Sequence, residues 1–245
     1  FDVAMELQRE AARKAWAGSG EAVTEEVWFD VCEETGGSEF LGYDTETAEG
    51  VIASIVMNGQ PAERLEAGQS GMVVTNQTPF YAESGGQMGD EGLIVTSEGG
   101  EFAVSDTVKR LDELHVHVGE MRRGSFAKED AVVMRVDGER RTRMRANHSV
   151  THLLHASLRE RLGDHVAQKG SLVAPDYLRF DFSHPKAVSA EEMLVIEADV
   201  NERIRENASV VTRQMTPDEA QKAGAVALFG EKYGDEVRVV SMGDA

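Results

Sequence analysis

The chain has 245 residues, with 25 Lys and Arg against 44 Asp and Glu, which gives a formal net charge of −19 at pH 7. Hydrophobic residues make up 41% of the sequence, which is typical of a globular protein and excludes wholesale disorder. There is no apolar run long enough to span a bilayer and no signal-peptide pattern, so we expect a cytoplasmic protein without a membrane partner. Cys32 is the single cysteine, which excludes an intrachain disulfide framework.

The charge is unevenly distributed along the chain. Residues 1–50 hold thirteen acidic and three basic side chains. Residues 135–186 hold ten basic and six acidic ones, together with five of the seven histidines. The whole-chain charge therefore does not exclude a nucleic-acid partner, because such a partner would meet the basic stretch and not the average surface.

Two helices are predicted at the start of the chain. Residues 1–18 are rich in Ala, Glu, Gln, Arg and Lys, which favour helices, and no capping residue precedes them. We therefore expect the chain to be part of a longer one. The second helix is expected to end at the Gly36-Gly37 pair. Its apolar stripe consists of Val23, Val27, Val31 and Cys32.

From Leu41 onward, the apolar residues recur in short runs separated by Gly, Asn or Asp, which predicts β-strands. Asn58-Gly59 is a strong hairpin signal. Several short strands at this spacing favour a small β-barrel or sandwich over roughly 40–137. The predicted strands are 51–57, 72–75, 93–96, 102–108, 114–118 and 132–136.

After Arg145 the pattern becomes mixed α+β. A helix is expected to begin at Asn147 as its cap and to end before Gly163. Ser189 and Glu192 form a capping-box pair ahead of another helix. The inner face of that helix is expected to hold Met193, Ile196, Val200 and Ile204. The remaining elements are strands over 177–182, 209–215 and 237–242, and a short helix that opens at Thr216-Pro217.

Two histidines, His148 and His152, are four residues apart on the helix predicted after Asn147, and so share one face of it. That spacing suits two ligands to a metal ion, and His155 follows on the same side. A polar helix face is the alternative, because His-x-x-x-His is short and common. Two ligands do not complete a tetrahedral zinc shell, so the spacing alone leaves both interpretations open.

The chain resembles the editing domain of alanyl-tRNA synthetases in six segments that follow one another in family order. These segments cover most of residues 40–244, and the first ~35 residues resemble, more loosely, the helical connection from the aminoacylation module. The segments are TPFYAESGGQMGDEG (78–92), NHSVTHLLH (147–155), VAQKGSL (166–172), LRFDFSH (178–184), ALFGEKYG (227–234) and RVVSMGD (238–244).

The resemblance implies an α+β fold with N-terminal helices, a glycine-rich small β-barrel and a two-layer α+β editing domain. The boundaries expected are 1–38, 39–140 and 141–245. The parent enzyme would attach alanine to tRNA(Ala) with ATP, in an aminoacylation domain absent from this sequence. The editing domain would hydrolyse mischarged Ser-tRNA(Ala) and Gly-tRNA(Ala). Such a second site is needed because one methylene or hydroxyl gives only about 1–3 kcal/mol of discrimination in a binding pocket.

The resemblance also implies a zinc ion, held by His148, His152, and the Cys and His of a Cys-Gly-Gly-Thr-His motif. That motif follows the Ser-Met-Gly-Asp segment in the family, whereas this sequence stops at Ala245. We therefore expect this chain alone to bind zinc weakly or not at all, and to be weak or inactive as a deacylase.

Gln168 and Thr151 are the candidate catalytic residues. Gln168 lies where the family places polar residues on the substrate side, and its amide is suited to hydrogen-bond a serine hydroxyl. An ordinary surface glutamine is the alternative. Thr151 lies between the two histidines, where it either lines the pocket or packs against the next helical turn.

Two other features have structural interpretations. The segment around Gly85-Gly86 lacks the Gly-Lys-Ser/Thr ending of a P-loop, so we expect a turn in a barrel hairpin that shapes the cleft. His115 and His117 lie on one face of a predicted strand. We expect them to alternate on the exposed barrel surface and not to bind metal.

A basic run precedes the histidine helix and is the candidate contact with the acceptor stem of tRNA(Ala); no DNA partner is expected. A charged linker between domains is the alternative. Two further alternatives concern the whole chain: a non-catalytic tRNA-binding module, and a free-standing trans-editing protein, against which the helical lead-in argues. The candidate contacts are Arg140, Arg141, Arg143 and Arg145, with Arg135 just upstream.

Overall fold

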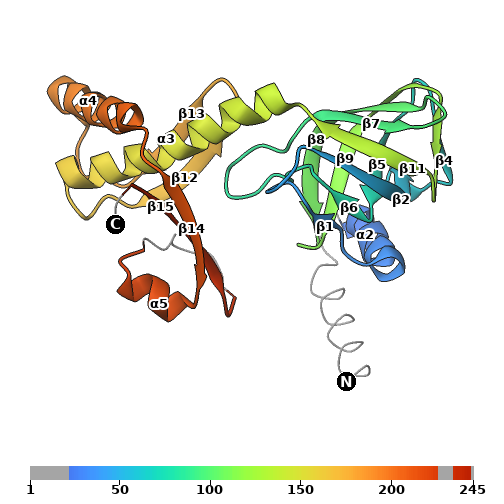
Figure 1. Cartoon of the computed structure of the whole chain (residues 1–245), viewed down its shortest axis with the longest axis horizontal. Helices are drawn as coiled ribbons and strands as arrows, with labels where there is room; N and C mark the ends of the chain where they lie inside the picture. Colours follow the sequence, from blue (N-terminus) through green and yellow to red (C-terminus); the bar gives the residue numbers. More distant parts are fainter. Residues whose placement is uncertain (1–21, 226–233, 244–245) are drawn as a thin grey trace. The chain divides into compact units, whose positions relative to one another are not determined.

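The computed structural model describes residues 22–225 and 234–243. It is an α+β structure that divides into two compact units, one ending at Thr142 and the other beginning at Arg143 (Figure 1). The predicted fold class is confirmed. The helix expected over residues 1–18 lies outside the described residues.

Helix α2 (Ala22–Thr35) packs on the barrel of the first unit instead of standing apart from it. Its buried side chains are Val27, Trp28 and Val31. They contact a barrel cluster that includes Leu114 and Val116. Gly36, with φ of +71°, ends the helix in the left-handed conformation that glycine adopts without strain.

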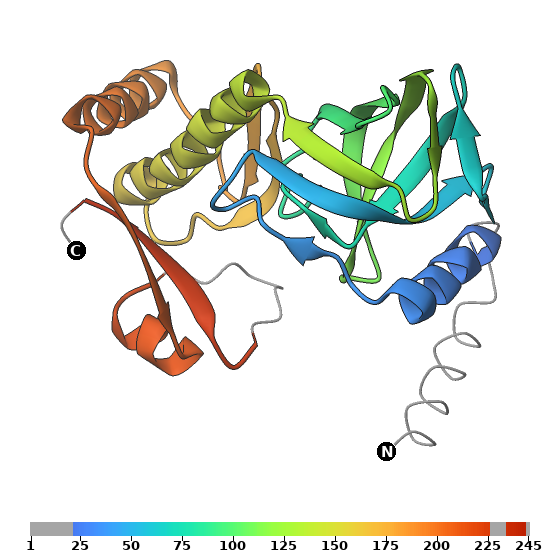
Figure 2. The same cartoon turned by 45° about the vertical axis from the view of Figure 1, so that its right-hand side comes forward.

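Six antiparallel strands of the first unit close into a barrel (Figures 1 and 2). All six predicted strands are confirmed, with ends that extend by a few residues. Closure leaves no open edge between the first and last strand, and the interior is filled by buried apolar side chains. In spatial order the strands are β2 (Thr47–Met57), β5 (Ser70–Thr75), β9 (Leu114–Arg123), β8 (Glu101–Arg110), β7 (Gly92–Thr96) and β11 (Ala131–Val136), which pairs with β2 again.

Short strands complete this unit. The predicted hairpin is confirmed: Asn58 and Gly59 both have positive φ, 50° and 74°, as a type I′ turn between β2 and β3 requires. Gly85 and Gly86 also have positive φ, in the turn expected for them. The short strands are β1 (Glu39–Phe40), β3 (Gln60–Pro61), β4 (Arg64–Glu66), β6 (Gln77–Thr78) and β10 (Ser125–Ala127).

The expectation that His115 and His117 lie exposed on the barrel is wrong. They are 8% and 0% exposed. The His117 Nδ1–H donates to the Val73 carbonyl at 2.9 Å, and its Nε2 accepts from the Thr78 hydroxyl at 2.8 Å. Burial is the main cause that lowers the pKa of both imidazoles from 6.5 to about 4. Both residues are therefore neutral structural groups of the barrel at pH 7.

The barrel is expected to lose stability as the pH falls from about 6.5 to 4. His117 takes up a proton near pH 6.5 in the unfolded chain but only near 4 when folded, so in this window the unfolded state binds more protons. The full effect is about 3 kcal/mol, since each pKa unit is worth about 1.4 kcal/mol. Urea unfolding at pH 7.5 and 4 measures it, and His117→Gln, which has no titratable ring, should show a smaller pH dependence. An equal dependence in both proteins would contradict this assignment.

Helix α3 (Gly138–Leu162) begins nine residues earlier than predicted, so Asn147 is not its cap. Asp137 takes that role, because its Oδ1 accepts from the Arg140 N–H at 3.0 Å. Asn147 instead uses its side-chain amide to donate to the Ala174 carbonyl at 2.8 Å. The residues before Asn147, rich in Arg, continue the helix because they are good helix formers.

The hypothesis that Arg140 and Arg141 contact tRNA fails for these two residues, because both are buried in the first unit. The Arg140 guanidinium donates to the Gly89 carbonyl at 2.7 Å and pairs with Glu91 at 2.9 Å. Arg141 forms an ion pair with buried Asp90. The two arginines thus bind the glycine-rich segment to the first turn of α3.

The second unit is built on the remainder of α3, two hairpins and two further helices. The strand β12 was not predicted, whereas the other elements were. The Ser189–Glu192 capping box is confirmed, and Thr216 forms a second one at α5. The elements are β12 (Gln168–Val173), β13 (Leu178–Phe182), α4 (Ala190–Glu206), β14 (Val210–Met215), α5 (Pro217–Lys222) and β15 (Val237–Met242).

Only part of the inner face predicted for α4 is buried. Ile196 and Val200 are 4% and 8% exposed, whereas Met193 and Ile204 are 59% and 46% exposed.

Among the described helices, none combines the length and apolar character needed to cross a bilayer.

Candidate functional site

The candidate site lies where α3 packs on the β12–β13 hairpin. A small core of Leu158 and Val166 joins the helix to the hairpin, and Phe180 and Phe182 pack against it from β13. In the antiparallel register Gln168 lies opposite Phe182 and Ser171 opposite Phe180. Residues directly opposite each other point to the same face of a sheet. The hairpin therefore presents Gln168 on the face that is packed against α3.

His148 and His152 lie together on α3 as their spacing predicts. Their ring centroids are 5.1 Å apart and their planes differ by 19°. Desolvation lowers the pKa of both, and the neighbouring His152 lowers that of His148 further. Both are therefore held in the neutral form, which is the form that binds a metal ion.

The residues present fit zinc in their donor chemistry but supply only part of its shell. Two neutral imidazoles one helical turn apart match the nitrogen ligands that zinc prefers. Within residues 22–225 and 234–243, however, no group of three or more His, Cys, Asp or Glu side chains is arranged to hold a metal ion. A zinc ion bound by His148 and His152 would need further ligands.

Gln168 and Thr151 differ in what their polar groups do. Gln168 is half-buried, and its side-chain amide makes no hydrogen bond to any other part of the chain that the structure describes. Its donors and acceptor are therefore available to a ligand. Thr151 is 5% exposed, and its hydroxyl donates to the Asn147 carbonyl at 2.9 Å. Of the two roles predicted for Thr151, this arrangement matches the second, in which the side chain packs against the neighbouring turn of α3.

His155 is a residue to which the sequence assigned no role beyond its place on the helix face. Its ring lies 5.1 Å from that of Phe180, centroid to centroid. Desolvation is the main cause that lowers its pKa. The i, i+4, i+7 spacing with His148 and His152 was the only signal for it in the sequence.

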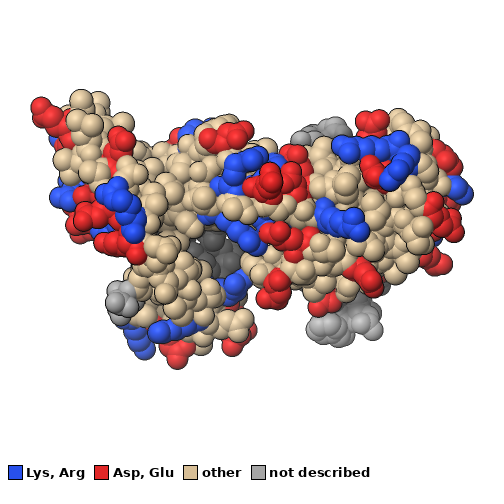
Figure 3. Space-filling view, turned by 45° about the horizontal axis from the view of Figure 1, so that its top comes forward, with Lys and Arg blue, Asp and Glu red and all other residues tan. Residues whose placement is uncertain are grey.

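Arg143 and Arg145 are exposed on α3, unlike Arg140 and Arg141. Basic and acidic side chains are interspersed over the face shown in Figure 3, instead of separating into one basic strip. Only Arg143 and Arg145 of the four candidate contacts thus remain on the surface.

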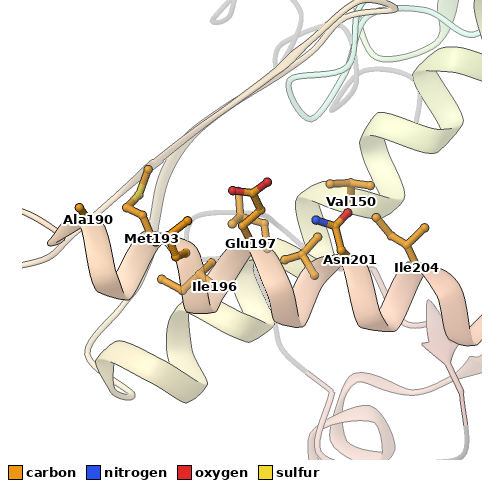
Figure 4. A pocket seen from close by; sticks show the side chains of 10 residues that line it. Val150, Ala190, Met193, Ile196, Glu197, Asn201 and Ile204 are labelled. Carbon is orange, nitrogen blue, oxygen red and sulfur yellow. The ribbon is translucent and has the colours of Figure 1, made fainter.

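An apolar groove of about 670 Å³ lies between α3 and α4, away from the histidines (Figure 4). Its side of α3 presents Val150 and Leu154, which the helical period places on the face opposite His148 and His152. Glu197 and Asn201 are its polar members. The groove therefore does not contain the candidate site.

Comparisons with known proteins cover the whole chain. A family model described as class II (A) tRNA synthetases matches residues 1–140. The alanine–tRNA ligase of Rhizorhabdus wittichii is 60% identical over 245 residues, which are 100% of this chain and 28% of that protein. The corresponding ligases of Parvibaculum lavamentivorans and Sphingopyxis alaskensis are 56% and 59% identical, over 99% and 100% of this chain and 27% and 28% of their own lengths.

The chain thus spans little more than a quarter of the length of the curated relatives it matches. The family model covers more than half of the chain. The chain therefore belongs to the class II (A) tRNA synthetase family, and it is similar over its whole length to alanine–tRNA ligases.

Proposed function

We propose that this chain is part of an alanine–tRNA ligase, and that its second unit holds most of a site that hydrolyses Ser-tRNA(Ala) and Gly-tRNA(Ala). The observation that carries the proposal is the pair of neutral imidazoles, His148 and His152, on the helix that packs against the strand of Gln168. The segments that resemble the editing domain of alanyl-tRNA synthetases include both elements. The parent enzyme would charge tRNA(Ala) with alanine and ATP in another domain.

The residues have distinct roles in this proposal. His148 and His152 would hold a zinc ion, completed by a Cys and a His outside this sequence. When bound, zinc supplies a Lewis acid that orients the aminoacyl group or activates a water. Gln168 would hydrogen-bond the hydroxyl of a seryl group, and an alanyl group would leave the amide without that partner. Arg143 and Arg145, which are exposed, would contact phosphates of the acceptor stem.

Hydrolysis of Ser-tRNA(Ala) by the full-length polypeptide and by the 245-residue chain tests the function. We expect the full-length protein to release serine and the chain alone to be much slower. His152→Ala in the full-length protein should lower the rate at least about 100-fold, since even residues that only orient a metal ligand are worth 10–100-fold. His165→Ala, at another exposed histidine of the same unit, is the matched control.

The outcomes separate the proposal from its alternatives. No hydrolysis by either protein, together with tight tRNA(Ala) binding, would contradict the proposal and favour a non-catalytic binding module. An equal loss in the two histidine variants would contradict the role of His152. Similarity to the ligases over the first 35 residues argues against a free-standing trans-editing protein.

A further inference from the structure

Helix α4 leaves a row of apolar side chains uncovered along the groove between α3 and α4. Met193, Leu194 and Ile204 line this groove and are 59%, 66% and 46% exposed. Met193 and Ile204 point from α4 to the same side, together with Glu197 and Asn201 (Figure 4). Large apolar side chains that are exposed next to one another mark an interaction surface.

The row is spaced as in helices that pack along one another. Its members are three and four residues apart in turn, the repeat that keeps a seam of side chains on one face of a helix. They are Ala190, Met193, Glu197, Val200 and Ile204. On the other side of the groove, Val150 and Leu154 of α3 supply apolar contacts. The groove therefore fits one further helix.

The charges at the two ends of α4 indicate which helix that is. Its first turn carries Glu191 and Glu192, and its last turn carries Arg203 and Arg205. A second α4 that runs antiparallel brings its basic last turn beside this acidic first turn, and it also opposes the two helix dipoles. A parallel copy would place like charges side by side. The ends of α4 are thus complementary to the same helix in the antiparallel direction.

We propose that the groove binds α4 of a second copy of this chain, antiparallel and related to the first by a two-fold axis. Placing Met193 opposite Ile204 of the second copy puts this axis between residues 198 and 199. Glu197 then lies beside Asn201 of the second copy, whose amide donates to the Glu197 carboxylate. Each contact occurs twice because the axis is two-fold. The polar members of the groove thus satisfy each other across the interface.

The same register places Glu191 beside Arg205 of the second copy. Glu192 and Arg203 already form ion pairs within the chain, so Glu191 and Arg205 are the end charges left for this contact. Within one helix these two residues are about 21 Å apart and do not pair with each other. The second copy covers the groove side of α3 and leaves the candidate site on its other face open.

Sedimentation equilibrium of the 245-residue chain tests the pairing. A contact between single helices is small, so we expect a dimer with a Kd of about 10 µM. Met193→Asp buries a charge in the apolar row and should weaken the dimer at least about tenfold. Val195→Asp is the matched control, because Val195 is 44% exposed on α4 but does not line the groove. A chain that stays monomeric at about 300 µM, or equal weakening by both substitutions, would overturn the inference.

Exchanging the end charges tests the antiparallel direction. Glu191→Lys and Arg205→Glu each place like charges together at both ends of the pair, and each should weaken the dimer about fivefold. The double variant restores opposite charges between the copies and should recover most of the affinity. Damage to the helix would instead add up in the double variant. No loss in the single variants, or no recovery in the double variant, contradicts the antiparallel pairing.

Photo-cross-linking identifies the occupant of the groove in the full-length protein. With the photoreactive residue benzoylphenylalanine in place of Met193, irradiation should give a covalent dimer. Mass spectrometry should then locate the link within residues 200–206 of the second copy. A link to another segment of the full-length protein, or the absence of any link, would show that a second α4 does not occupy the groove.

Discussion

Replacing Gln168 by His in the full-length protein is expected to lower the rate of Ser-tRNA(Ala) hydrolysis by about 100-fold or more, the usual effect of losing one preorganised donor at a reacting centre. Alanylation should be unchanged, because it takes place in another domain of the proposed parent. The amide of Gln168 is half-buried, faces α3, and makes no hydrogen bond elsewhere in the described chain. An imidazole at this position differs in shape and in the placement of its donor.

The adjacent residue provides the control. Lys169 is exposed, and in the strand it follows Gln168 at the bulge between Gln168 and Gly170. Lys169→Ala should leave serine hydrolysis within about twofold, since surface substitutions rarely exceed 0.5 kcal/mol. Deacylation and alanylation assays on both variants measure the difference. Unchanged hydrolysis in Gln168→His would remove Gln168 from the site.

The barrel could be predicted from the sequence because its strands are half-buried. In β2, β5 and β11 the apolar side chains face the interior, and this produces the short apolar runs seen in the sequence. The same reasoning failed for His115 and His117 in β9, because this strand is covered on both faces. Leu114 and Val116 pack against α2, whereas the imidazoles on the other face pack against Phe40 and Phe80.

In α3 and in the second unit, long-range contacts determine what local patterns do not. The cap of α3 is Asp137. The sequence signal had pointed to Asn147, but the side-chain amide of Asn147 donates to the carbonyl of the distant Ala174. Strand β12 has no regular alternation because of its bulge, and it exists through pairing with β13. Met193 on α4 remains exposed because the groove is covered by no other described element.

The helical period was sufficient to bring His148 and His152 together, because both lie within one regular element. Gln168 is different. Its approach to the same helix depends on the hydrogen bonds of Val166 and Ala167, which join residues 7 to 16 positions apart and leave no periodic signal. The resemblance to a known family is what favoured a role for Gln168, whereas residue patterns alone left an ordinary surface glutamine as an equal alternative.

Replacing Arg141 by Met is expected to destabilise the first unit by about 3–5 kcal/mol, because it leaves a buried carboxylate without its partner. The side chains of Arg141 and Asp90 are 4% and 1% exposed. The guanidinium also donates to the carbonyls of Gly42 and Pro79. One residue thus satisfies three acceptors from two separate loops, and without it all three lose a partner inside the protein.

Urea unfolding followed by tryptophan fluorescence measures this cost, since both tryptophans, Trp16 and Trp28, precede residue 143. Arg123→Met is the control, because its ion pair with Glu101 lies at the surface, with the Arg123 side chain 71% exposed, and should contribute less than about 1 kcal/mol. A second substitution that removes the charge, Asp90→Leu in the Arg141→Met protein, should restore part of the loss. If Arg141→Met costs no more than Arg123→Met, the buried pair does not hold the glycine-rich segment to α3.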